Sequence, residues 1–108
     1  MRVTYTKLIR DRIPEVIQAD GRRAITRVLD THGYRSALLA KLIEEAHEAQ
    51  AASPDELAGE LADIFEVLQA LLPPLAMTWQ DLMALAATKR EDRGGFTRRL
   101  FLEYVEAD

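Results

Sequence analysis

Apolar and polar residues follow a helical period over most of the chain. Residues 31–52 and 54–72 both repeat apolar side chains at intervals of three and four, which predicts two long helices. Asp30 is a suitable N-cap for the first helix. The sequence SPDE at 53–56 combines a serine cap, a proline at the first helical position and a glutamate that closes a capping box. It therefore predicts the start of the second helix, which the prolines at 73–74 should end.

Two further helices are predicted outside this pair. Pro14 suits the first turn of a short helix that should stop at Gly21. Thr78, with Asp81 three residues later, predicts a helix that ends near the glycines at 94–95. The short connection at Ser53 should make the two long helices pack antiparallel, which favours a helical bundle.

Two segments show the alternation of a strand. Residues 24–29 (AITRVL) and residues 98–106 (RRLFLEYVE) place apolar and polar side chains in turn, so each could form a short strand. The two could pair into a small ribbon beside the helices. We therefore expect a mainly α fold: an antiparallel helical bundle with a short two-stranded β ribbon.

Composition narrows the class of protein. With 108 residues, of which 48% are hydrophobic and 30% charged, the chain suits one globular domain over residues 1–108. A domain this small gains burial by pairing with a second copy, so we expect a homodimer or a higher homo-oligomer. The lack of cysteine excludes disulfides and thiolate metal sites, and fits a reducing cytoplasm. No membrane span or signal-peptide core is visible, and the net charge of −4 argues against binding a nucleic-acid polymer.

The acidic residues gather in the middle of the chain, at the two long predicted helices. At about 100° per residue, Glu45 falls just off the edge of the apolar arc of the first helix. Glu48 lies roughly 60° further round, and Glu44 further still. On the second helix Glu60 falls inside the apolar arc and Asp63 lies at its border.

Glu60 is the most informative of these positions. An ionised carboxylate within a buried arc is costly unless it is paired. Antiparallel packing should bring Glu45 and Glu48 towards Glu60 and Asp63, and Lys41 is the only nearby cation on these helices. A divalent metal ion would resolve the repulsion, and ligation by oxygen alone favours Mg²⁺ or Mn²⁺. Either acidic motif alone is more often a solvated helix face.

Basic residues gather at both ends of the chain. Lys7 and Arg10 precede the first predicted helix, and Lys89 and Arg93 lie at the end of the last, beside the Gly94-Gly95 turn. An acidic cluster cannot hold phosphates unaided, so these four residues are our candidates for contacts to a ligand that carries phosphates. The alternatives are that they are solvated surface charges, or that Lys89 stabilises the end of its helix.

These motifs together resemble the MazG-like, all-α nucleoside triphosphate pyrophosphohydrolases, which include phosphoribosyl-ATP pyrophosphohydrolase and the dimeric dUTPases. The family signature, EExxE followed on the next helix by ExxD, stands here at 44–48 and 60–63. The opening KLIRDRIPEVI (7–17) and the closing KREDRGGFTRRLFL (89–102) look like a small house-cleaning branch of that superfamily. The resemblance covers nearly the whole chain.

The resemblance implies a function and a role for each acidic residue. Glu45, Glu48, Glu60 and Asp63 would hold Mg²⁺, and Glu44 would orient or deprotonate the attacking water. Hydrolysis would give a nucleoside monophosphate and pyrophosphate. Two alternatives stay open: hydrolysis of phosphoribosyl-ATP, and a non-catalytic helical dimer that uses the acidic cluster as a structural ion site.

Overall fold

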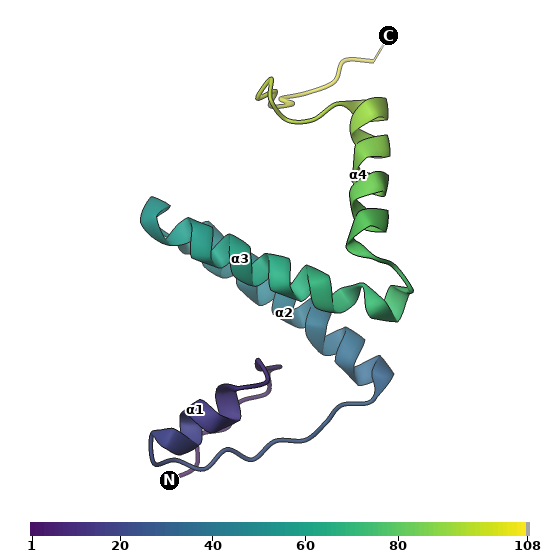
Figure 1. Ribbon diagram of the computed structural model, residues 1–108. Helices are drawn as coiled ribbons and strands as arrows, with labels where there is room; N and C mark the ends of the chain where they lie inside the picture. The colour runs from purple at the N-terminus through teal and green to yellow at the C-terminus, as the bar shows by residue number, and fades with distance from the viewer. Residues whose placement is uncertain (108) are drawn as a thin grey trace. The chain divides into compact units, whose positions relative to one another are not determined.

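The structure, a computed structural model, describes residues 1–107 and is built from helices (Figure 1). The described part contains four α-helices and one short 3₁₀ helix: α1 (Ile13–Ala19), α2 (Thr31–Ala51), α3 (Pro54–Leu71), η1 (Pro73–Leu75) and α4 (Trp79–Arg93). The mainly α prediction is confirmed. The chain divides into two compact units, Met1–Ala76 and a second that begins at Met77, and we describe each by itself.

Helices α2 and α3 form an antiparallel pair, which Figure 1 shows side by side. Both predicted caps are present at their starts. The Asp30 carboxylate accepts a hydrogen bond of 2.7 Å from the backbone N–H of Gly33. The backbone N–H and the hydroxyl of Ser53 both donate to the Glu56 carboxylate, at 3.1 and 2.9 Å. The caps satisfy backbone groups that would otherwise lack partners, and so fix where each helix begins.

The core of the first unit lies between these two helices. Leu38 of α2 packs against Val67 and Leu71 of α3, and all three are buried. Leu8, from the segment before α1, and Tyr34 pack against this cluster. The core is therefore small, and it joins the opening segment to the helix pair.

Part of each predicted apolar arc faces away from the partner helix. Leu39 and Ile43 of α2 are 46% and 59% exposed, and on α3 Leu57 and Leu61 are 38% and 53% exposed. Phe65 of α3, which is not part of the predicted arc, is 43% exposed. The sequence pattern identified these positions as apolar but did not reveal that a single helix pair covers only one side of each arc. This leaves an apolar face on the α2–α3 pair.

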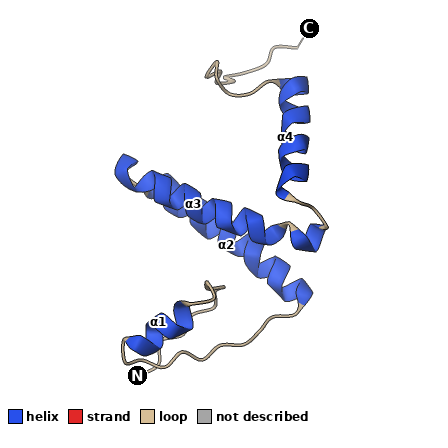
Figure 2. Cartoon of the chain, viewed as in Figure 1, coloured by secondary structure: helices blue, strands red, loops and turns tan. Residues whose placement is uncertain are grey.

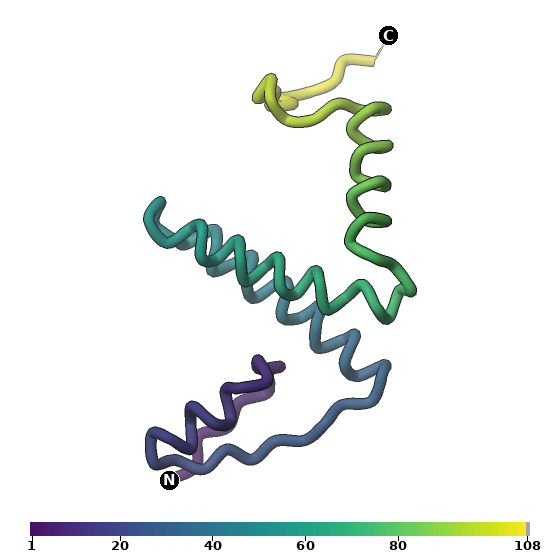
Figure 3. The backbone as a smooth tube through the Cα atoms, in the orientation of Figure 1, coloured from purple at the N-terminus to yellow at the C-terminus, as the bar shows by residue number. Residues whose placement is uncertain are grey.

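The predicted β ribbon is wrong: none of residues 1–107 lies in a strand (Figure 2). Residues 22–30 run as an extended connection from α1 to α2 (Figure 3), where Ile25 and Val28 are 79% and 98% exposed. The tail after α4 is likewise without regular structure as far as residue 107. A two-stranded ribbon is marginal without a surface to pack on, so alternation alone was an insufficient signal.

The second unit is organised around α4. Thr78 and Asp81 form the predicted capping box, with N–H to side-chain oxygen distances of 2.9 and 3.1 Å. Hydrogen bonds from the backbone N–H and the hydroxyl of Thr78 hold the pKa of Asp81 below its ordinary value. Gly94 ends the helix with a φ of +83°, which L-residues with a side chain rarely adopt.

No single helix within residues 1–107 has the length and apolarity to cross a membrane, although Pro54–Leu75 and Trp79–Arg93 would meet these criteria together as a bent pair.

Gly59 offers a test of the packing around α3. It lies inside the helix, and a Cβ added there meets no atom within 4 Å. We expect Gly59→Ala to raise the free energy of unfolding by about 0.5–1 kcal/mol, because alanine restricts the unfolded chain and favours the helix. Urea denaturation followed by circular dichroism measures the change.

Gly94→Ala is the matched control for that substitution. Its backbone conformation is nearly restricted to glycine, so the same change should cost on the order of 1–3 kcal/mol. A loss of stability in Gly59→Ala would instead show that another helix or a second copy approaches α3 at this position.

Candidate metal centre

Three carboxylates converge between α2 and α3. Glu45 of α2 and Glu60 and Asp63 of α3 each place one oxygen within 4.8 Å of the oxygens of the other two. Glu45 is 7% exposed and is the one charged residue among the buried side chains of the described chain. Glu60 and Asp63 are half-buried. The antiparallel pairing thus brings together three of the four residues predicted to bind the metal.

Two oxygens in this cluster are buried without a hydrogen-bond partner among residues 1–107. They are Oε2 of Glu45 and Oε2 of Glu60. Leaving such an atom unpaired costs free energy, and a charged atom costs more than a neutral one. A cation between the two helices would satisfy both oxygens, which is why we regard the cluster as a candidate metal centre.

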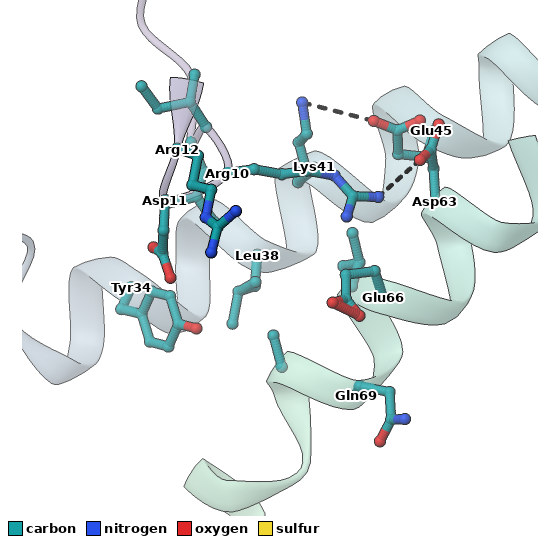
Figure 4. A pocket seen from close by; sticks show the side chains of 14 residues that line it. Arg10, Asp11, Arg12, Tyr34, Leu38, Lys41, Glu45, Asp63, Glu66 and Gln69 are labelled. Atoms are coloured by element: carbon teal, nitrogen blue, oxygen red, sulfur yellow. Dashed lines mark hydrogen bonds and ion pairs between the residues drawn. The ribbon is translucent and has the colours of Figure 1, made fainter. Parts of the chain in front are cut away.

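Two basic side chains partly neutralise the cluster (Figure 4). Lys41 Nζ lies 3.5 Å from both Glu44 and Glu45, which follow it by three and four residues and so lie about one turn further along α2. Arg10 Nη2 lies 2.7 Å from Asp63 Oδ1 and donates a hydrogen bond to it. The pattern on the two helices revealed Lys41 but not Arg10, because Arg10 is 53 positions from Asp63 in the sequence.

The environment of Glu45 raises its pKa above the ordinary value. Burial is the main cause, because it removes water from the ionised form. The negative charges of Glu48 and Asp63 raise the pKa further, while Lys41 opposes them through its charge and its hydrogen bond. Lys41 therefore compensates only part of the cost of ionising Glu45.

The remaining acidic residues lie around this centre. Glu44 is half-buried and accepts a long hydrogen bond of 3.5 Å from Lys41. Glu48 is exposed and is not among the three converging carboxylates, although it is close enough to raise the pKa of Glu45. Its role as a metal ligand stays a prediction.

A cavity of about 620 Å³ lies next to the carboxylates. Arg10, Lys41, Glu45 and Asp63 line one part of it. Apolar side chains and Tyr34 line another part, and Figure 4 shows Tyr34 and Asp63 at opposite ends. A volume of this size suits a small-molecule ligand that has both a charged and an apolar portion.

The predicted phosphate-binding residues are divided between the two units. Arg10 lies at the carboxylates, whereas Lys7 is exposed and its ammonium group lies 5.7 Å from the centre of the Tyr5 ring. Lys89 and Arg93 belong to the second unit, where both are exposed. Arg93 also borders a cavity of about 450 Å³ formed by the loop after α4. Contact of these residues with phosphate stays a prediction.

Comparison with known proteins gives a partial match. Over 54 residues the chain is 48% identical to an uncharacterized protein of Mycolicibacterium smegmatis. The matched segment covers 50% of this chain and 55% of that protein. The chain thus spans about half the length of the curated relative it matches. No protein-family model matches the chain, and no solved structure matches it.

The buried charge of Glu45 predicts a pH-dependent stability in metal-free protein. Since the folded state raises this pKa above 4.5, the folded state holds the proton more tightly than the unfolded chain does. This contribution is fully present below the ordinary glutamate pKa and is lost as the pH rises through the raised value. Glu45→Gln removes that loss, so its melting temperature should exceed that of the wild type at neutral pH but not in acid.

Glu66→Gln is the control, because it makes the same charge change at an exposed position of α3. Melting curves of chelator-treated protein across the pH range measure both variants. A gain for Glu45→Gln that does not depend on pH would contradict the prediction.

Proposed function

We propose that the protein is a divalent-metal-dependent hydrolase that cleaves a nucleoside triphosphate between its α and β phosphates. The products would be a nucleoside monophosphate and pyrophosphate, and the role would be the removal of unwanted nucleotides. The observation that carries the proposal is the convergence of Glu45, Glu60 and Asp63 around two buried, unpartnered oxygens. The reaction itself is proposed from the resemblance of the motifs at 44–48 and 60–63 to those of the pyrophosphohydrolases.

The donor atoms fit Mg²⁺ or Mn²⁺ in kind. All of them are carboxylate oxygens, which hard divalent cations prefer, and the described chain offers no thiolate or imidazole in the cluster. Glu45, Glu60 and Asp63 would hold the ion, with Glu48 beside them. When bound, Mg²⁺ would offset the charge of the triphosphate and polarise its phosphoryl oxygens as a Lewis acid, which would make phosphorus easier to attack.

Glu44 is our candidate for the group that handles the proton. It lies next to the buried Glu45 but is itself half-exposed, so water can reach it. Lys41 contacts both residues and so restrains the Glu44 side chain. In the proposed reaction, a water oxygen attacks one of the two phosphorus atoms joined by the α–β bridging oxygen, and Glu44 takes the proton of the water. The bond from that phosphorus to the bridging oxygen breaks, so that the nucleoside monophosphate and pyrophosphate separate.

We further propose that the protein acts as a homodimer, with the apolar face of α2 and α3 as the contact. Leu39 and Ile43 on α2, and Leu57, Leu61 and Phe65 on α3, are all more than a third exposed. On each helix they lie roughly a quarter-turn, in the same sense, from the residues that face the partner helix. Because the helices are antiparallel, both rows lie on one side of the pair, away from the side that carries Lys41 and Asp63. A second copy docked there would complete a four-helix bundle.

The lack of cysteine is our ground for proposing a cytoplasmic location. Phosphoribosyl-ATP hydrolysis would use the same carboxylates, and a substrate panel distinguishes it from house-cleaning activity.

The activity is tested by incubating the protein with canonical, damaged and phosphoribosylated nucleotides plus Mg²⁺, and measuring pyrophosphate release. Glu60→Gln and Asp63→Asn should reduce turnover by at least about 10–100-fold, because each removes a carboxylate from the metal centre. Both should retain the helical circular-dichroism spectrum of the wild type.

The same variants separate a catalytic ion from a structural one. A structural ion would make both variants unfold and would raise the melting temperature of the wild type strongly. The proposal fails if no nucleotide is hydrolysed and calorimetry detects no binding of Mg²⁺ or Mn²⁺.

The dimer is tested by placing a charge on the apolar face. We expect Leu61→Lys to shift the sedimentation mass from dimer to monomer, because burying an unpaired ammonium is costly. Ala62→Lys is the control, since its exposed side chain lies on the side of α3 opposite to α2. Equal masses for the wild type and Leu61→Lys would rule out this contact.

A further inference from the structure

The contact between Arg10 and Asp63 ties the opening segment of the chain to the carboxylate centre. Arg10 lies before α1, outside any helix, and its guanidinium reaches Asp63 Oδ1 at 2.7 Å. Both side chains remain about half exposed, at 56% and 41%. Arg10 therefore supplies a positive charge to the carboxylates that would surround a divalent cation.

Arg10 and a divalent cation draw on the same negative charge. Asp63 belongs to the three converging carboxylates, so a cation bound among them would share Asp63 with the guanidinium or take its place. Two positive charges around one carboxylate repel each other, and ion pairs that are open to water are weakly held. Of the ion pairs at the centre, the one between Arg10 and Asp63 should therefore break most easily when a divalent cation binds.

Lys41 differs from Arg10 in this respect. It contacts Glu44 and Glu45 from the same helix, and its side chain is only 18% exposed. The backbone of α2 keeps it beside both carboxylates whether or not another cation is present. Arg10 belongs to a non-helical segment and also lines the cavity beside the carboxylates. Its side chain therefore has space to move from Asp63 into that cavity.

We propose that Arg10 is a built-in, exchangeable counter-ion of the metal centre. Without a divalent cation it neutralises Asp63; with one bound it leaves Asp63 and turns to the phosphate chain of a ligand in the adjoining cavity. Guanidinium groups bind phosphate oxygens in pairs, which suits this second role. The inference rests on the metal centre proposed above and adds that metal binding and phosphate binding are coupled through Arg10.

The first test compares the affinities of the wild type and Arg10→Met for Mn²⁺ by calorimetry at fixed pH and ionic strength. Removing the competing charge should tighten Mn²⁺ binding about two- to fivefold, which is the range expected for a solvent-exposed ion pair. Arg10→Lys keeps the charge but loses the forked geometry, so its affinity should lie between the two.

Arg12→Met is the matched control. Arg12 also lines the cavity and is exposed, and the same charge is removed without touching the contact to Asp63. Its effect on Mn²⁺ affinity should be smaller than that of Arg10→Met. Equal tightening in the two variants would reflect overall charge alone and would overturn the proposal.

The second test uses inorganic tripolyphosphate, which has the phosphate chain but no base or sugar. In saturating Mg²⁺, Arg10→Met should bind it about tenfold more weakly than the wild type, because a charge-assisted contact is lost. The two opposite shifts of Arg10→Met, tighter binding of the metal and weaker binding of the phosphate chain, are the signature of exchange. A residue that only maintains the fold would not produce them.

Each other result is decisive. If Arg10→Met binds Mn²⁺ as the wild type does or more weakly, Arg10 instead holds Asp63 in place for the metal, and the exchange is wrong. If tripolyphosphate binding is unchanged, Arg10 does not move to phosphate. If the wild type binds no Mn²⁺ or Mg²⁺, the metal centre itself fails and the inference fails with it. Arg10→Lys decides the outcome should Arg10→Met not fold.

Discussion

The burial of carboxylates between α2 and α3 is the constraint on which the rest of the structure depends. The small core of Leu38, Val67 and Leu71 continues directly into the cluster around Glu45, so apolar packing and charge repulsion act in the same contact. The packing draws the helices together, and that approach removes water from Glu45 and raises its pKa. The free energy of unfolding of a fold of this size is small, so an uncompensated buried charge removes a large part of it. The partly uncompensated charge of Glu45 therefore lowers the stability of the fold in the absence of a bound cation.

The sequence revealed the helices well because their signals are local. Asp30, Ser53 and Thr78 each cap a helix within three residues, and the structure has the corresponding helices starting where these residues predict. The ribbon was predicted from alternation alone, whereas a strand needs a partner and a surface. Neither requirement can be read from residues 24–29 by themselves.

The candidate site was predictable only in part, for a similar reason. Helical periodicity placed Glu45, Glu60 and Asp63 near the helix contact, and the structure brings them together. Periodicity suggested that Glu60 is the most buried of these carboxylates, whereas in the structure Glu45 is the most buried. The error arises because an arc drawn on one helix does not show which part of it the neighbour covers. The pairing of Arg10 with Asp63 depends on how distant segments fold back, which no local pattern encodes.

The connection between α2 and α3 is very short, since α2 ends at Ala51 and α3 begins at Pro54. The Ser53–Glu56 capping contacts leave it almost no freedom. The relative height of the carboxylates on the two helices is consequently set by a two-residue connection. One inserted residue there would change the height and the angle at which α3 meets α2, and so would shift Glu60 and Asp63 relative to Glu45. Length changes in the extended stretch before α2 would leave that arrangement intact. Across evolution, the chain should therefore vary in length at the outer connections while this inner one stays fixed.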